Sequence, residues 1–175
     1  RSLPASESID PKRGDGKLVG FSTQKVLTQK VMGTQVRVLF SGDTIVEREH
    51  WNSPRLARTW GRLAIKMIDE TEQPLYWLLL SKGFRTYRFL PLFFRCYAPA
   101  VNRSTPSGLD QVRRALMQEM YADAFDPATC IVKGSAIDNY SLRSGVADID
   151  NARLDNPHIR FFMASNPGHR NGNEL

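Results

Sequence analysis

The sequence is poor in the residues that build metal centres and disulfide frameworks. It has 2 cysteines and 3 histidines in 175 residues, which is too few for a zinc cluster or a set of stabilising disulfides. It also lacks a long apolar stretch, since residues 73–81 hold only 9 uncharged residues in a row. A membrane-spanning helix needs about 20 apolar residues. We therefore expect a cytoplasmic protein that binds no metal and has no membrane span.

The motifs of several large enzyme classes are absent as well. The sequence contains no Walker loop, no GxGxxG, no GxSxG and no HExxH. A further absence is local, because no acidic residue lies between Glu72 and Asp110. This acid-free stretch holds five of the cations of a chain with net charge +6: Lys82, Arg85, Arg88, Arg95 and Arg103. Such a basic field predicts an anionic partner, with a solvated basic face as the alternative.

The first part of the chain predicts paired strands. Residues 1–16 are polar and rich in turn formers, so we expect a flexible N-terminal arm, followed by a single domain over residues 17–175. β-forming residues dominate residues 17–31 and 35–47, on either side of a Met-Gly turn. Gly42-Asp43 interrupts the second strand, and glycine within a strand is typical of a β-bulge.

The period then changes from strand to helix. Ser53-Pro54 is a helix start, and a helix ending near residues 69–72 is expected to bury one apolar stripe. Residues 75–80 form a continuous apolar run that favours a central strand buried on both faces. Residues 84–97 favour a helix that Pro91 should kink or break. The stripe of the first helix is Leu56, Trp60, Leu63 and Met67.

The last third of the sequence predicts one more helix and two short strands. Thr105-Pro106 opens the amphipathic helix, and residues 129–133 favour a strand. Residues 134–157 have a loop-like composition, and residues 159–164 (IRFFMA) favour a last strand. The complete order of these expected strands and helices predicts a mixed α/β fold.

The stretch from Gly20 to Tyr97 resembles the core of the GCN5-related N-acetyltransferase (GNAT) superfamily. The matching features are the interrupted strand, its exit at Val46, the turn to a helix and the apolar strand that follows. This resemblance implies a mostly antiparallel central sheet flanked by helices. In the family, backbone N–H groups of the turn hold the pyrophosphate of coenzyme A (CoA) at the helix N-terminus. The family's glycines fall here at Asn52 and Pro54, and Pro54 has no N–H to offer.

The resemblance implies acetyl-CoA or another acyl-CoA as cofactor, or an acyl-carrier protein in its place. Asp43 or Glu47, at the end of the strand, would accept a proton from the acceptor, and Glu49 is more typical of a surface charge. Tyr87 or Tyr97 would protonate the departing thiolate, with core packing as the alternative for Tyr87. The cations after the apolar strand would bind cofactor phosphates or an acidic carrier protein. The candidate cofactor-binding residues are Asn52, Ser53, Arg55, Lys82, Arg85 and Arg88.

Three functions follow from these features. The leading hypothesis is an acyltransferase that acts on an amine or hydroxyl of a small molecule. The altered turn at Asn52-Ser53-Pro54 favours the second, a GNAT-like module that binds CoA or another anion without turnover. The third is a single-stranded nucleic-acid binder that uses arginines and interleaved aromatics such as Phe89 and Phe93. We consider nucleic acid the weakest option, because so many aromatic side chains favour burial in the core. A second copy of the chain, forming a homodimer, stays open as a further partner.

Overall fold

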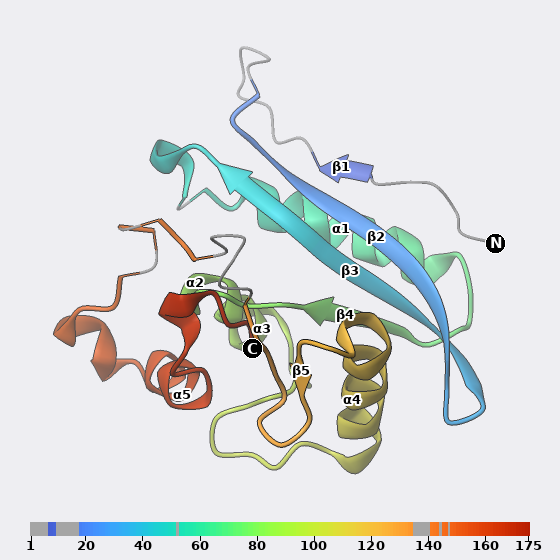
Figure 1. The fold of residues 1–175 in the computed structure, drawn as a ribbon. Coiled ribbons are helices and arrows are strands. Elements are labelled where there is room, and N and C mark those ends of the chain that lie inside the picture. The colour runs from blue at the N-terminus through green and yellow to red at the C-terminus, as the bar shows by residue number, and fades with distance from the viewer. Residues whose placement is uncertain (1–6, 10–17, 52, 135–140, 144, 147) are drawn as a thin grey trace. The chain divides into compact units, whose positions relative to one another are not determined.

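The computed structural model describes residues 7–9, 18–51, 53–134, 141–143, 145–146 and 148–175. It confirms a mixed α/β fold with a mostly antiparallel sheet and flanking helices (Figure 1). The chain divides into two compact units, residues 1–78 and residues 79–175. The first unit contains the four-stranded sheet, in the order β1-β2-β3-β4, and the second is mostly helical.

A long antiparallel hairpin forms the body of the first unit. Strands β2 (Gly20–Val31) and β3 (Thr34–Val46) are joined by Met32 and Gly33, whose φ angles are 50° and 82°. Positive φ at both central residues is the geometry of a type I′ turn, which matches the twist of a hairpin. Strand β1 (Glu7–Ile9) lies within the stretch expected to be an arm and pairs antiparallel with β2.

The predicted bulge is present in β3. The register of the hairpin shifts between Ser22 and Gln24, so that the single residue Thr23 faces two residues of β3, Gly42 and Asp43. A Cβ atom on Gly42 would lie 2.6 Å from Oγ1 of Thr23. Glycine therefore allows the two strands to approach at the point where the extra residue is inserted.

Helix α1 (Arg55–Asp69) follows the short 3-10 helix η1 (Arg48–His50) and begins within one residue of the predicted start, with Pro54 rather than Ser53 as its N-cap residue. Its apolar stripe is only partly in the core, because Met67 is buried whereas Leu56, Trp60 and Leu63 are half-buried. The helix lies along the sheet and leads to β4 (Leu75–Leu79), whose arrow points the same way as that of β3 (Figure 1). A strand–helix–strand connection of this length suits parallel neighbours.

The prediction of a central strand over residues 75–80 is wrong. Within the described residues β4 stands last in the order of the sheet, and only Leu78 of this strand is buried. A continuous apolar run indicates that side chains avoid water, but it does not set how many strands lie beside the backbone. Trp77 illustrates the difference, because it is half-buried and uses its indole N–H in a polar contact.

The aromatic segment of the second unit is helical only in part. It forms α2 (Phe84–Tyr87) and α3 (Phe89–Phe93), and the chain becomes extended at Phe94, so that Tyr97 lies outside the helices. The break falls at Arg88 rather than at Pro91, which corrects the predicted kink. Pro91 lies in the first turn of α3, where a backbone N–H has no acceptor within the helix and its loss costs little.

The second unit also contains two longer α-helices. Helix α4 (Ser107–Tyr121) begins directly after Pro106, as expected. The predicted strand over residues 159–164 is wrong, because this segment is helix α5 (Pro157–Ser165). Asn156 caps α5 through its side-chain oxygen, which accepts from the backbone N–H of His158 at 3.0 Å. The asparagine followed by proline at the first helical position is a start signal that outweighs the β-like composition.

The end of the chain pairs with two distant segments of the second unit. Strands β5 (Phe125–Asp126) and β6 (Ile131–Val132) form a small hairpin, with β6 inside the predicted strand of residues 129–133. Glu174 forms an antiparallel bridge with Val132. On the other side, Ser81 and Leu175 exchange two backbone hydrogen bonds of 3.0 and 3.1 Å. The last residues thus connect the start of this unit to its hairpin.

Candidate functional site

A continuous chain of polar side chains crosses the sheet beside the bulge. The Trp77 indole donates to the Ser41 hydroxyl at 2.7 Å, and Ser41 donates to Oε1 of Gln24 at 2.7 Å. Nε2 of Gln24 donates to the Ser22 hydroxyl at 2.8 Å, and Ser22 shares a 2.8 Å hydrogen bond with the hydroxyl of Thr44. Ser22, Gln24 and Ser41 are buried. Because buried polar groups hold fixed positions when their hydrogen bonds are satisfied, this chain fixes the strands around the bulge.

Sequence reasoning missed this polar chain. Ser22 and Gln24 alternate along β2, and alternating polar residues are also what the solvent face of an antiparallel strand shows. The one available signal was the position of Gln24 across from the bulge. Gln24 pairs with Ser41, the residue directly before Gly42. The pattern identifies the strand correctly but does not show which of its polar side chains are buried.

The two candidate carboxylates lie at and beyond the bulge. Asp43 is exposed, and its backbone carbonyl faces the Thr23 hydroxyl at 3.5 Å. Glu47 is also exposed and follows the last residue of β3, where its backbone N–H donates to Val19 at 2.8 Å. Glu49 is exposed as well, in agreement with a surface charge. Both candidates are thus accessible to a small molecule.

The turn between β3 and α1 folds back against the end of β3. The Trp51 indole donates to the Val46 carbonyl at 3.0 Å, and the Arg48 guanidinium lies over its ring at 5.8 Å. The Ser53 backbone N–H donates to His50 at 2.9 Å, so this donor is used within the turn. Asn52, a candidate cofactor-binding residue, lies outside the described residues.

The N-terminus of α1 carries positive charge that no acidic residue of its first turn balances. Helices commonly place Asp or Glu there because the dipole and the unpaired N–H groups favour anions. In α1 the first turn has no acidic residue, and the arginines Arg55 and Arg58 are exposed. Ser53 Oγ accepts a long hydrogen bond of 3.4 Å from the Arg55 N–H. The residues present therefore fit an anionic group by charge alone, because the N–H groups of Ser53 and Arg55 already donate within the turn and Pro54 has no N–H.

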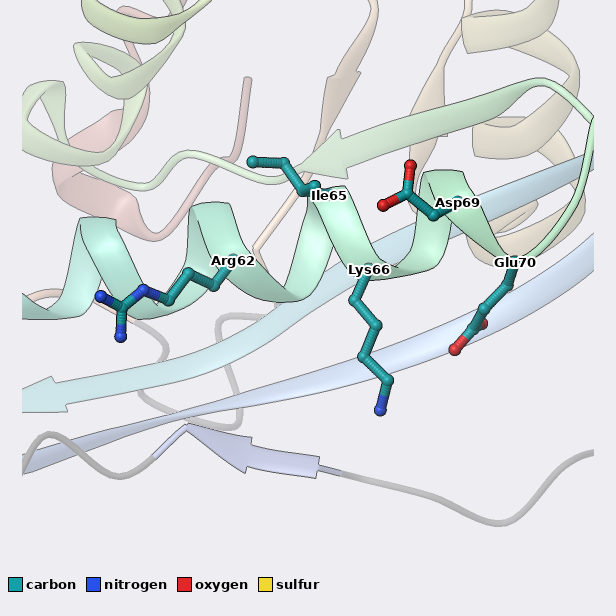
Figure 2. A pocket seen from close by; sticks show the side chains of 5 residues that line it. All are labelled: Arg62, Ile65, Lys66, Asp69 and Glu70. Atoms are coloured by element: carbon teal, nitrogen blue, oxygen red, sulfur yellow. The ribbon is translucent and has the colours of Figure 1, made fainter.

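An open groove runs along the opposite end of the same helix. Figure 2 shows the five side chains that line it: Arg62, Ile65, Lys66, Asp69 and Glu70. All of them are exposed, and they carry charges of both signs. The groove does not include Ser53 or Arg55, and so it is separate from the anion site predicted at the helix start.

Tyr87, a candidate proton donor, lies in the core of the second unit. Only 1% of its surface is exposed, and its hydroxyl donates to the Pro99 carbonyl at 3.0 Å. Its ring contacts Phe161 and Phe162 with centroid distances of 5.8 and 6.0 Å. Burial raises the pKa of the Tyr87 phenol far above its usual value. This is the environment of a core tyrosine, which was the alternative considered for this residue.

The other candidates of the second unit have varied environments. Tyr97 is half-buried, with the Arg103 guanidinium 5.2 Å from its ring centre. Lys82 forms an ion pair of 3.3 Å with Glu174, and Arg85 donates to the Val146 carbonyl at 3.1 Å. Arg88, the third of the cations expected to bind phosphate, is half-buried. Lys82 and Arg85 therefore also stabilise the second unit itself.

Comparison with known proteins gives a weak structural likeness and no match in sequence. No protein-family model and no curated protein match the sequence. A crystal structure of a Trypanosoma brucei acetyltransferase resembles the chain with a TM-score of 0.35 and 14% identity. The likeness covers 53% of this chain and 63% of that protein, so the chain spans less than two thirds of its length. Among the described residues, none of the helices is both long and apolar enough to cross a membrane.

Proposed function

We propose that the protein is an acyltransferase that moves an acyl group from a CoA or acyl-carrier-protein thioester to an amine or hydroxyl of a small molecule. The observation that supports this best is the bulge at Gly42 and Asp43, in the strand that leads to α1. A bulge leaves the backbone of one strand without its regular ladder partner. A free backbone N–H at such a point is suited to polarise a carbonyl oxygen.

In this proposal the exposed Asp43 carboxylate accepts the proton that the acceptor amine or hydroxyl releases. Arg55 and the start of α1 hold the phosphates of the donor, for which charge is the supporting evidence. When bound, the donor would supply the acyl group as a thioester. Tyr87 is excluded as a proton donor to sulfur, because its hydroxyl is buried and already donates to the Pro99 carbonyl.

Binding and turnover test the proposal separately. The melting temperature should rise with the concentration of CoA and acetyl-CoA, as mass action requires. Thiol release from acyl-CoA should then depend on an added amine or alcohol. Asp43→Asn should lower this rate about 100-fold or more, the usual contribution of a general base, with CoA binding retained. Asp123→Asn, at an exposed position of the second unit, is the matched control and should keep the full rate.

A second function is favoured by the proline at the helix start. Pro54 is the N-cap residue of α1 and offers no backbone N–H, so the phosphate cradle has fewer donors than in an active family member. The alternative is therefore a GNAT-like module that binds CoA or another anion without transferring an acyl group. CoA-dependent stabilisation without thiol release across a panel of amines and alcohols would identify it. Salt-sensitive binding of single-stranded oligonucleotides, with no effect of CoA, would instead indicate nucleic acid.

A further inference from the structure

Two large apolar side chains project from the end of α3. Leu92 is 62% exposed and its neighbour Phe93 is 58% exposed. The opposite side of this short helix is in the core, since Leu90 is buried. Phe89 packs against Phe93 with a centroid distance of 5.6 Å, which holds the exposed ring in place. Adjacent exposed residues of this size form an apolar protrusion rather than scattered surface contacts.

Arginines flank this protrusion. Arg95 follows Phe93 by two residues and is exposed. The exposed Arg103 returns to the same place, because its guanidinium donates to the Arg95 carbonyl at 3.0 Å and lies over the ring of Tyr97. Neither guanidinium forms an ion pair with any residue that the structure describes. The sequence supplies no acid between Glu72 and Asp110, so the segment that carries the protrusion has only positive charges.

We propose that this surface docks on a lipid bilayer with anionic headgroups. We call it the α3 patch and define it by five residues: Leu92, Phe93, Arg95, Tyr97 and Arg103. In this arrangement Leu92 and Phe93 enter the boundary between headgroups and acyl chains, and the two guanidinium groups bind lipid phosphates. Tyr97 has the mixed character that suits the interface between them.

A bilayer fits the patch better than an acidic protein does. The arginines alone would serve either partner, because both present negative charge. The protruding Leu92 and Phe93, however, gain most from an apolar phase that they can enter, and an acidic protein face is largely hydrated. The inference rests on charge and exposure within the second unit, and it does not depend on acyl-CoA binding.

Cosedimentation with vesicles tests the proposal on the full chain. We expect binding to vesicles of phosphatidylcholine mixed with phosphatidylglycerol, and little binding to phosphatidylcholine alone. Binding should weaken as salt is added, since the arginines act through screened charges. Equal binding to both kinds of vesicle, or to neither, would overturn the proposal.

Matched variants locate the binding surface. Leu92→Ser/Phe93→Ser should weaken vesicle binding about tenfold or more, because both apolar anchors are lost. The control is Ile65→Ser/Ile68→Ser on α1, where the side chains are 61% and 57% exposed. Equal losses in these two variants would refute a specific patch.

Charge reversal supplies an independent comparison. Arg95→Glu should also weaken binding about tenfold, since each arginine near an anionic surface contributes about a factor of five and reversal adds repulsion. Arg170→Glu, an exposed arginine of η3 (His169–Asn171), should change binding less than about twofold on the same scale. The opposite ranking would place the contact elsewhere on the molecule and refute the α3 patch.

Cys96 provides a direct probe that leaves the patch intact. Its thiol is exposed beside Arg95, and the other free thiol, Cys130, is removed as Cys130→Ser. An environment-sensitive fluorophore on Cys96 should shift to shorter wavelength on anionic vesicles, because the label enters a less polar region. An unchanged spectrum at saturating lipid contradicts insertion. Binding of soluble polyglutamate through Arg95, without vesicle binding, would identify an acidic protein as the partner instead.

Discussion

Trp77 of β4 donates its indole hydrogen to the hydroxyl of Ser41 in β3 at a distance of 2.7 Å. The same hydroxyl donates to Gln24 of β2, so one serine joins the polar groups of three strands. Because Ser41 directly precedes Gly42, this connection fixes the strand immediately before the bulge. The candidate site of the first unit is therefore supported by buried hydrogen bonds as well as by apolar packing.

Ser41→Ala should destabilise the protein by about 1–3 kcal/mol, because it removes the hydrogen donor of the buried Gln24 carbonyl oxygen. Urea unfolding followed by tryptophan fluorescence measures the change in the free energy of unfolding. Thr28→Ala, at an exposed position of the neighbouring strand, is the control and should cost less than about 1 kcal/mol. Equal costs would show that the polar chain adds nothing to stability.

Gly42→Ala and Gly61→Ala should change stability in opposite directions. At position 42 the new methyl group meets the Thr23 hydroxyl, and the Thr23 side chain must move at a cost of about 1–3 kcal/mol. At position 61, within α1, the added methyl group has no atom within 4 Å apart from the neighbouring residues and the backbone of the helix itself. Alanine should therefore stabilise the helix by about 0.5–1 kcal/mol. Thermal unfolding of the two variants distinguishes these effects. A neutral Gly42→Ala would mean that the bulge tolerates a side chain.

Tyr87 should make the stability of the protein fall at alkaline pH. Burial is the main cause of its raised pKa, the nearby Tyr97 adds to the shift, and Arg103 opposes it. An unfolded tyrosine ionises near pH 10, so the folded state retains the Tyr87 proton to higher pH than the unfolded state does. The contribution of the neutral phenol is complete below about pH 10 and is lost as the pH rises towards the folded pKa.

Unfolding by urea at pH 8 and pH 11 measures this effect. Tyr87→Phe should cost about 1 kcal/mol at pH 8, because the Pro99 carbonyl loses its donor. The variant should lose less of its stability than the wild type between the two pH values, since it lacks the phenol that titrates. A parallel loss in both proteins would show that Tyr87 does not contribute to the alkaline transition.

Asn156→Ala should cost about 1 kcal/mol, the usual effect of removing an N-cap side chain. The cap oxygen bonds to the His158 N–H at the start of α5, whereas the exposed Asn171 has no capping role there. Asn171→Ala is therefore the control and should be nearly neutral. Comparable melting temperatures of the two variants would contradict the assignment of Asn156 as the cap of α5.

The parts of the fold that the sequence predicted correctly have explicit local signals. Gly42-Asp43 marked the bulge, Met32-Gly33 marked the hairpin turn, and the proline at position 54 marked the start of α1. Each signal works because the residue limits the backbone itself. These signals are local, and so they hold whatever the chain packs against.

The failures concern features that only tertiary contacts decide. Residues 159–164 consist mostly of apolar and β-forming residues, and their helix becomes evident only from the cap at Asn156. The apolar run at residues 75–80 showed a strand but not its place in the sheet. Of the candidate site, the exposed Asp43 lies at the bulge as expected, but the buried Gln24 beside Ser41 was indicated only by its position across from the bulge.

The pairing of Ser81 with Leu175 has a consequence for synthesis. These residues stand near the two ends of the second unit, and their two hydrogen bonds form only when both segments are present. While a ribosome still covers residue 175, the nascent polypeptide can complete the hairpin of β2 and β3 but cannot close the later unit. Any pause in translation before residue 175 leaves the ribosome would therefore prolong the time during which the apolar side chains of this unit are open to chaperones.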